Sequence, residues 1–274
     1  MTLCAADCVT TDLAARALGK CSRLADFADV ILFCDTPVAE NGLSCVPIPR
    51  LNSRADYSAF VLKDLARFVT TDFVLVVQWD GYVLEPSAWT AEFLKFDYIG
   101  ARWHWHKDGM TVGNGGFSLR SRRLLDATAA AEFQLLPDVN EDEQICRARR
   151  PELADRGIRF APEALADCFS YERSLPARQT FGFHGLFNLW RHCEDRELID
   201  LAYEFPQHVL RSVEFVELLL GQVNMRKFPV IRALYANWRR SCSALEMRAQ
   251  LLRATSDQHV VDRLEDLFKS LVPT

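Results

Sequence analysis

The segment that most constrains the fold is the run Phe-Val-Leu-Val-Val at Phe73–Val77, which contains no polar side chain. It ends directly at Gln78-Trp79-Asp80-Gly81, so the apolar run is short. A short, continuous apolar run predicts a strand that is buried on both faces, as in parallel sheets covered by helices.

Similar runs recur along the first two thirds of the chain and alternate with amphipathic stretches. Strands are expected at residues 2–6, 30–34, 73–77, 98–101 and 158–160, with the segment 181–185 closing this part. Helices are expected at residues 11–27, after the N-cap residue Ser53, after Pro86, and at 122–132 and 141–155. This alternation predicts an α/β fold with a mostly parallel open sheet flanked by helices.

The pattern changes after about residue 188. Glycine nearly disappears there, and helical periodicity dominates at residues 198–205, 209–220, 230–238 and 260–271. We therefore expect an α/β domain over residues 1–187 and an all-helical C-terminal region over residues 188–274.

Composition limits the partners and the compartment. The net charge of −5 argues against a nucleic-acid partner, and no apolar stretch reaches membrane-spanning length. The nine cysteines are an odd number without zinc-type spacing, and most lie in apolar runs. Reduced core cysteines are typical of a reducing compartment, so we expect a cytoplasmic protein.

Asp80 is the first candidate for chemistry, because ligands of open α/β sheets bind outside the carboxyl ends of the strands. A carboxylate there suits Mg²⁺ or Mn²⁺ held against a diphosphate, with Gly81 allowing close approach. The alternative is that Asp80 only stabilises an Asp-Gly turn.

Gly113, Gly115 and Gly116 form a second candidate. Three glycines in four positions let backbone N–H groups approach a ligand, although a tight bend between two strands would use them equally well. The spacing fits neither a dinucleotide fingerprint nor a P-loop.

The acidic run Glu141-Asp142-Glu143 opens an expected helix. Glu141 or Asp142 could act as the general base that takes a proton from an acceptor hydroxyl. All three carboxylates could instead simply complement the helix dipole.

Histidines supply two further candidates. His184, flanked by glycine and phenylalanine at residues 181–185, is either a metal ligand or a hydrogen-bonded core residue. His104 and His106 are either metal ligands or part of a half-exposed strand or loop with the stacking tryptophans Trp103 and Trp105.

Several of these segments together resemble one family. They are residues 76–84 (VVQWDGYVL), 113–121 (GNGGFSLRS), Glu141-Asp142, 158–163 (IRFAPE) and 181–185 (FGFHG). The chain resembles a bacterial and fungal family that is named as a domain of unknown function and regarded as glycosyltransferase-like, over roughly residues 1–187. More distantly, the order of motifs resembles inverting glycosyltransferases of the GT-A fold.

The resemblance implies roles for particular residues. Asp80 matches the last carboxylate of an Asp-x-Asp motif, with Gln78 in place of the first, and His184 matches the last ligand of an Mn²⁺ or Mg²⁺ ion. Asp142 matches the base and Glu141 an acceptor-contacting carboxylate. The residues expected to meet the donor nucleotide are Asp7, Asp35, Arg54, Gln78, Gly115, Gly116 and Arg120. Asp7 and Asp35 could equally be loop aspartates, and the two arginines could form ordinary salt bridges.

The expected function is metal-dependent, inverting transfer of a sugar from a nucleotide-diphosphate donor to a glycan or lipid-linked acceptor, in surface-polysaccharide assembly. A nucleotidyltransferase would need a glycine- and arginine-rich loop after the first strand, where this chain reads Ala5-Ala6-Asp7-Cys8-Val9. A non-catalytic sugar-binding or scaffold domain is the other alternative, and Gln78 favours it.

The helical region carries cations among apolar residues, and the cations are Arg226, Lys227, Arg232, Arg239 and Arg240. They could lie on an anionic membrane at its inner face, or they could form a solvated surface or a homo-oligomer contact.

Overall fold

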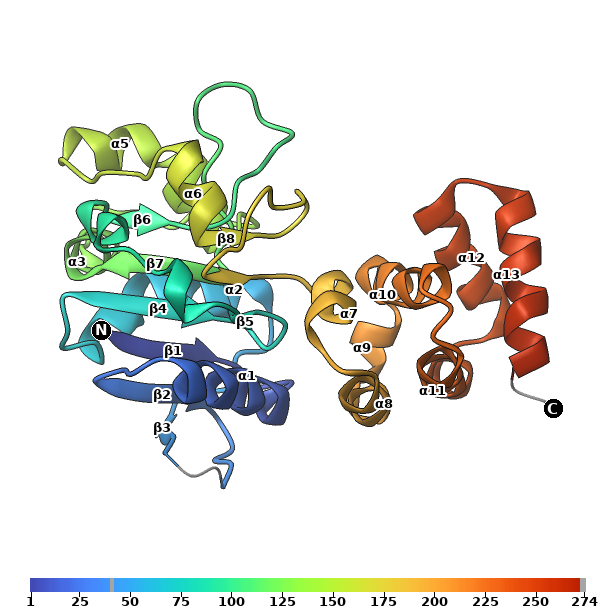
Figure 1. Ribbon diagram of the computed structural model, residues 1–274. Helices are drawn as coiled ribbons and strands as arrows, with labels where there is room; N and C mark the ends of the chain where they lie inside the picture. Colours follow the sequence, from blue (N-terminus) through green and yellow to red (C-terminus); the bar gives the residue numbers. More distant parts are fainter. Residues whose placement is uncertain (40–41, 272–274) are drawn as a thin grey trace. The chain divides into compact units, whose positions relative to one another are not determined.

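The computed structural model describes residues 1–39 and 42–271, which form two compact units, one ending at His184 and one beginning at Gly185. The first unit is built on a six-stranded sheet of order β3-β2-β1-β4-β7-β6 (Figure 1). Its strands are β1 (Thr2–Ala6), β2 (Asp29–Cys34), β3 (Ser44–Pro47), β4 (Phe73–Val77), β6 (Tyr98–Ile99) and β7 (Phe117–Ser121). Strands β3, β2, β1 and β4 are parallel, whereas β7 runs antiparallel to both β4 and β6. The expected α/β class with a mostly parallel sheet is therefore confirmed.

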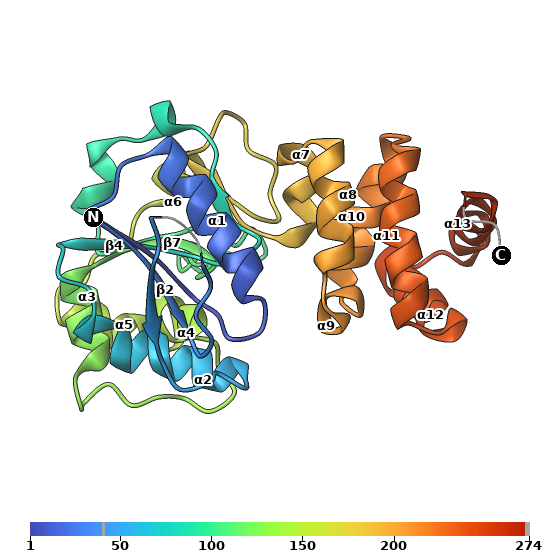
Figure 2. The ribbon, with the colours of Figure 1, turned by 90° about the horizontal axis from the view of Figure 1, so that it is seen from below.

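Helices cover both faces of this sheet. Figure 2 shows α1 (Thr11–Leu24) on one side and α2 (Arg54–Ala59) and α3 (Arg122–Ala129) on the other. The buried stripe of α1 contains Ala14, Ala17 and Cys21, whose small side chains allow a helix to approach a sheet closely. Ser53 caps α2 as expected, accepting a 3.1 Å hydrogen bond from the Asp56 N–H.

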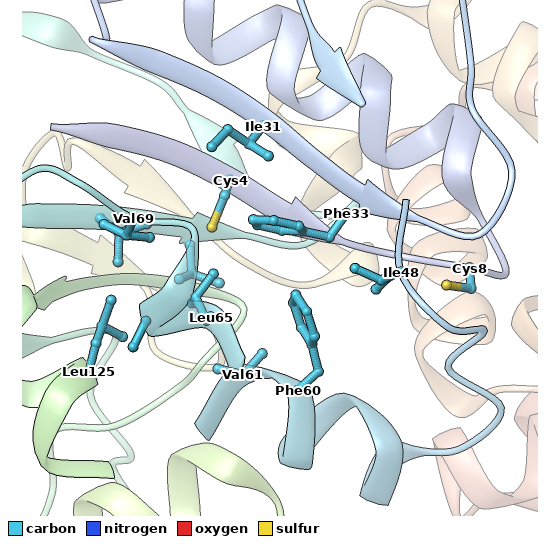
Figure 3. Packing of buried hydrophobic residues seen from close by; sticks show 13 residues of the cluster. Cys4, Cys8, Ile31, Phe33, Ile48, Phe60, Val61, Leu65, Val69 and Leu125 are labelled. Atoms are coloured by element: carbon cyan, nitrogen blue, oxygen red, sulfur yellow. The ribbon is translucent and has the colours of Figure 1, made fainter. Parts of the chain in front are cut away.

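The core on the α2 side explains why the strands are apolar throughout. Ile31 and Phe33 point to this side and pack with Phe60 and Leu65, while Leu32 between them is fully buried on the other face (Figure 3). A strand buried on both faces cannot alternate apolar and polar residues, which is why β2 and β4 read as continuous apolar runs.

The expected helix at 141–155 is wrong as a single element. The chain forms a short turn α4 (Glu141–Glu143), a π-helical turn (Gln144–Ala148) and then α5 (Arg150–Asp155). Pro151 has no N–H to donate, so it is accepted in the first turn of a new helix but not in the interior of a continuous one.

Other local elements complete the first unit. Helix α6 (Glu163–Phe169) was not expected, and residues 158–160 contribute only a single bridge between Phe160 and Tyr98. A π-helical turn (Phe60–Asp64) and a 3₁₀ turn (Leu65–Arg67) extend α2, and further 3₁₀ turns lie at Pro86–Ala88 and Ala91–Lys95.

A second, three-stranded sheet determines where the site forms. It has the order β5-β9-β8, with β5 (Tyr82–Val83) antiparallel and β8 (Ser170–Tyr171) parallel to the central β9 (Gly182–Phe183). Tyr82 pairs with Phe183, so the segments just before β5 and just after β9 are neighbours.

The described part of the second unit contains only helices, which confirms the expected helical C-terminal region. They are α7 (Leu189–His192), α8 (Asp195–Glu204), α9 (Gln207–Leu210), α10 (Val213–Asn224), α11 (Phe228–Ser241), α12 (Ala244–Thr255) and α13 (Gln258–Leu271), preceded by a 3₁₀ turn (Leu186–Asn188). The helix expected at 209–220 is divided between α9 and α10, because Ser212 caps α10 through the Phe215 N–H. In the part of the chain that the structure covers, no helix is long and apolar enough to cross a membrane.

Candidate active site

A cavity of about 480 Å³ lies where β4 ends, entirely within the first unit. Its wall comes from the residue after β4, the glycine-rich segment before β7, the start of α4 and the end of β9. The sequence-predicted residues that line it are Arg54, Gln78, Gly115, Gly116, Glu141, Asp142 and His184. The structure thus gathers residues from five separate segments around one space, counting the start of α2 with Arg54, whereas Asp80 is not part of the lining.

His184 is the centre of this arrangement. Its Nε2 lies 3.1 Å from Oε1 of Gln78 and 3.2 Å from Oδ1 of Asp80. Its Nδ1 lies 3.3 Å from Oε1 of Glu172 and 3.1 Å from Nδ2 of Asn114. The imidazole therefore connects Gln78 and Asp80 to Glu172, a carboxylate that sequence analysis did not identify.

Electrostatics favour a charged imidazole here. Burial by itself lowers the pKa of His184, but the carboxylates of Asp80 and Glu172 outweigh it and raise this pKa well above the ordinary value. The side chain of His184 is only 13% exposed. When both of its ring nitrogens carry a proton, the imidazole is a cation held between two carboxylates.

The donor set also fits a divalent cation. Neighbouring ligand atoms of an octahedral ion bound at about 2.1 Å lie about 3 Å apart. The distances from Nε2 of His184 to Oε1 of Gln78 (3.1 Å) and to Oδ1 of Asp80 (3.2 Å) are close to this value. A metal-binding histidine usually donates its second ring N–H to a carboxylate that orients it. Glu172, 3.3 Å from Nδ1 of His184, is in the position of that carboxylate. Within residues 1–39 and 42–271, no group of three or more His, Cys, Asp or Glu side chains is arranged for a metal, so the amide of Gln78 would be the third ligand.

The glycines are required by the side chains packed against them. A β-carbon at Gly116 would lie 2.1 Å from Nε2 of His184, and one at Gly115 would lie 1.9 Å from Oε1 of Glu141. The left-handed residue of the segment is Asn114, with φ 62°, not one of the glycines. Close packing therefore accounts for Gly115 and Gly116, and a bend alone does not.

The two adjacent acids at the start of α4 have different environments. Asp142 is partly exposed to the cavity, and its two oxygens accept hydrogen bonds from the backbone N–H groups of Gly115 (2.9 Å) and Glu143 (2.8 Å). Glu141 is buried and accepts a 3.1 Å hydrogen bond from Arg120. Burial and the Asp142 carboxylate raise the pKa of Glu141 to about 7, against the opposing effect of Arg120.

Arg120 does not line the cavity. Its side chain is 1% exposed, bonds to Ser118 and Glu141, and lies 5.5 Å from the ring centroid of Tyr98. Because Arg120 pairs with Val74 across the sheet, the pleat directs it to the face that α2 covers. Its charge is thus matched by Glu141 and is not left for a phosphate.

The two N-terminal aspartates also lie outside the cavity wall. Asp7 accepts hydrogen bonds from the Val9 and Thr10 N–H groups at 2.7 and 2.5 Å, next to the start of α1. Asp35 forms a 2.7 Å ion pair with Arg50, which lowers the pKa of Asp35.

Sequence reasoning missed several residues that line the cavity. Tyr57, Asn114, Asn140, Glu172 and Arg173 belong to this group, as do Trp103 and Trp105, which were expected in a half-exposed strand or loop. His106, expected either as a metal ligand or in that strand or loop, also lines the cavity. Glu172 follows the two-residue strand β8, and only the pairing of β8 with β9 brings it to His184. No local motif in the sequence reveals that pairing.

The profile of one protein family matches residues 42–184, slightly more than half of the 274 residues, and is described as "Protein of unknown function (DUF5672)". The chain belongs to the DUF5672 family. The matched range contains the Gln-Trp-Asp-Gly motif, the glycine-rich segment, Glu141-Asp142 and His184, so the family resemblance expected from these motifs is confirmed. No curated protein sequence matches this DUF5672 member.

Solved structures of glycosyltransferases are similar to this DUF5672 chain. One is a galactosyltransferase, LgtC, in complex with donor and acceptor sugar analogues (TM-score 0.45, 11% identity, covering 67% of this chain and 86% of that one). A second is a glycosyltransferase involved in glycosylation of the major capsid of PBCV-1 (0.43, 11%, 67% and 92%). A third is the apo form of GlyE from Streptococcus pneumoniae TIGR4 (0.40, 13%, 67% and 53%).

Proposed function

We propose that this chain is a glycosyltransferase that moves a sugar from a nucleotide-diphosphate donor to an acceptor hydroxyl. One observation carries the proposal: a single cavity is lined both by His184 and Gln78, with Asp80 outside the lining but 3.2 Å from Nε2 of His184, and by the Asp142 carboxylate. The first is a site for a cation beside a diphosphate, and the second is a candidate base.

Asp80, His184 and Gln78 would hold Mn²⁺ or Mg²⁺. When bound, such an ion neutralises negative charge on the departing diphosphate. The chain's own contribution is to fix the ligands: Glu172 orients the imidazole, and Gly116 leaves room for it. Arg54, exposed at the cavity wall, is a cation available to the donor phosphates, and Arg173 also lines the cavity.

Asp142 would be the general base. The backbone N–H groups of Gly115 and Glu143 fix the orientation of its carboxylate and leave further lone pairs free to face the cavity. As the acceptor oxygen bonds to the anomeric carbon, its proton passes to Asp142 and the bond from that carbon to the diphosphate breaks. One base and no nucleophile suffices for inversion of the anomeric configuration.

A non-catalytic sugar-binding domain is the second candidate. Gln78 favours it, because a neutral amide is a weaker ligand than the carboxylate of an Asp-x-Asp motif. Such a domain would bind a sugar or nucleotide without releasing nucleotide diphosphate.

The proposal also covers the pathway, the acceptor and the compartment of the reaction. We assign the activity to assembly of a surface polysaccharide on a glycan or lipid-linked acceptor in the cytoplasm. Cys4, Cys8, Cys21, Cys34 and Cys146 are buried free thiols in the first unit, which supports a reducing compartment.

Donor hydrolysis separates the two candidates. The protein is incubated with a set of UDP-, GDP- and dTDP-sugars, with Mn²⁺ or with EDTA, and the release of nucleoside diphosphate is measured. Release that depends on Mn²⁺ supports the transferase. Binding of donor without release from any of them supports the sugar-binding domain instead.

A further inference from the structure

The loop between β6 and β7, drawn in green at the top of Figure 1, presents aromatic side chains to the cavity. Trp105 lines the cavity and is 50% exposed, which is unusual for a tryptophan. Trp103, 5% exposed, packs its ring on Gly113, where a β-carbon would lie 2.3 Å from the ring. Trp103 therefore anchors the loop and leaves Trp105 at the surface of the cavity.

The rest of the loop is held in place by polar contacts. Arg147, in the turn that follows α4, donates 2.8 Å hydrogen bonds to the Met110 carbonyl and to the Asp108 carboxylate. Thr111 donates a 2.6 Å hydrogen bond to Glu163. The loop is thereby tied to the segment that begins with Glu141 and Asp142, so Trp105 and the candidate base belong to one prearranged wall.

The polar group of Trp105 is already used within the protein. Its Nε1–H donates to Nε2 of His106 at 3.1 Å. What Trp105 offers to a ligand is therefore its aromatic face, which attracts weakly positive C–H groups. One face of a pyranose ring presents such C–H groups, whereas its edge presents hydroxyls.

The neighbouring wall suits those hydroxyls. Asn140, Asp142 and Glu143 line the cavity beside this loop and provide hydrogen-bond acceptors. A nucleobase could stack on Trp105 too, but its phosphates would then meet the like-charged carboxylates of Asp142 and Glu143. The cavity-lining cations Arg54 and Arg173 offset this repulsion only in part. A neutral saccharide meets no such repulsion.

We infer that Trp105 is the platform on which a pyranose of the acceptor stacks, so that the acceptor is a saccharide. The role of this sugar as the acceptor rests on the proposed function. The stacking itself follows from the loop and its cavity.

Saturation-transfer NMR on the full chain tests the inference, with the methyl pyranosides of glucose, galactose, mannose and N-acetylglucosamine as probes. We expect transfer to the ring C–H protons of at least one glycoside. Trp105→Ala should weaken its binding about tenfold or more, whereas Trp105→Phe, which keeps an aromatic face, should retain most of it. Tyr203→Ala is the matched control, because Tyr203 is an aromatic residue 55% exposed in the other unit.

Three results would overturn the inference. They are absence of transfer to all four glycosides, unchanged glycoside binding in Trp105→Ala, and a tenfold loss of UDP or GDP affinity in Trp105→Ala, which would make the residue a nucleobase platform. Donor hydrolysis is measured separately on the same samples. Glycoside binding that needs Trp105, without any donor hydrolysis, refutes the proposed transferase and leaves the saccharide platform in place.

Discussion

The imidazole of His184 lies directly on the α-carbon of Gly116, and a β-carbon at that position would be 2.1 Å from Nε2. No side chain larger than hydrogen fits there while His184 keeps its contacts with Gln78 and Asp80. The glycine-rich segment and the metal-type donor set are thus parts of one arrangement.

This contact predicts the effect of Gly116→Ala. The new methyl group should displace the imidazole and lower the Mn²⁺-dependent affinity for a nucleoside diphosphate at least about tenfold, as calorimetric titration would show. Gly19→Ala is the control, because Gly19 lies inside helix α1 and does not line the cavity. Equal affinities for the wild type and Gly116→Ala would mean that His184 does not take part in binding.

Asp80→Asn should remove most of the metal-dependent binding of UDP or GDP while leaving the circular dichroism spectrum unchanged. The reason is that an amide replaces the carboxylate that lies 3.2 Å from Nε2 of His184. Asp126→Asn removes an exposed carboxylate from α3 and should have no effect. Unaltered titration curves for Asp80→Asn with Mn²⁺ would reject the metal assignment.

Asp142→Asn should keep donor binding and reduce turnover about 10²- to 10⁴-fold, as expected for a lost general base. Asp12→Asn is the control, because it removes a first-turn carboxylate from α1, a helix outside the cavity wall, and so tests the loss of a helix-dipole charge alone. A loss of less than tenfold in Asp142→Asn, or equal losses in the two variants, would show that Asp142 is not the base. NMR of the product tests inversion separately, and a product with the anomeric configuration of the donor would exclude it.

Arg120→Met should destabilise the protein by about 3–5 kcal/mol at pH 8, because it leaves the Glu141 carboxylate buried without its cation. The ordinary pKa of a glutamate is 4.5, and the unfolded chain has released the Glu141 proton above that pH. In the native state of the variant, the buried Glu141 keeps its proton to a higher pH. The native state binds more protons, so the stability of this variant should fall as pH rises from about 5 to 8.

Urea unfolding at the two pH values measures this effect. The double variant Arg120→Met/Glu141→Gln has no carboxyl group at 141 and should lack the additional pH dependence. A loss in Arg120→Met that is the same at pH 5 and pH 8 would argue against a pairing role for Arg120.

We expect a substitution of Gln222, in the second unit, to stabilise the protein. Gln222 is fully buried in α10, and within the residues that the structure describes neither amide atom has a hydrogen-bond partner. Gln222→Met should therefore raise the unfolding free energy by about 1 kcal/mol, measured by calorimetry. Gln250→Met should do the opposite, since Gln250 accepts a 2.8 Å hydrogen bond from the buried Trp238 indole. A lower melting temperature for Gln222→Met would indicate that its amide is satisfied after all.

The sequence by itself determined the fold class and several of the elements. Strand β4 was predicted with its observed bounds, Phe73–Val77, and the expected N-cap of α2 at Ser53 is present. The helical character of the C-terminal region was also evident. These features depend on apolar periodicity and capping, which act between residues close in the chain. The family was identifiable for the same reason, because its motifs are short contiguous segments.

Only the tertiary structure decided which side chains meet. Asp80 and His184 are neighbours because β5 pairs with β9, and Glu172 joins them because β8 pairs with β9 on the other side. Arg120 faces Glu141 and not the cavity because of the pleat and register of β7 against β4. Strand pairing of this kind joins segments far apart in the chain, and a shift of one residue would reverse every side chain. No local pattern in the sequence encodes that choice, so the composition of the site emerged only from the folded chain.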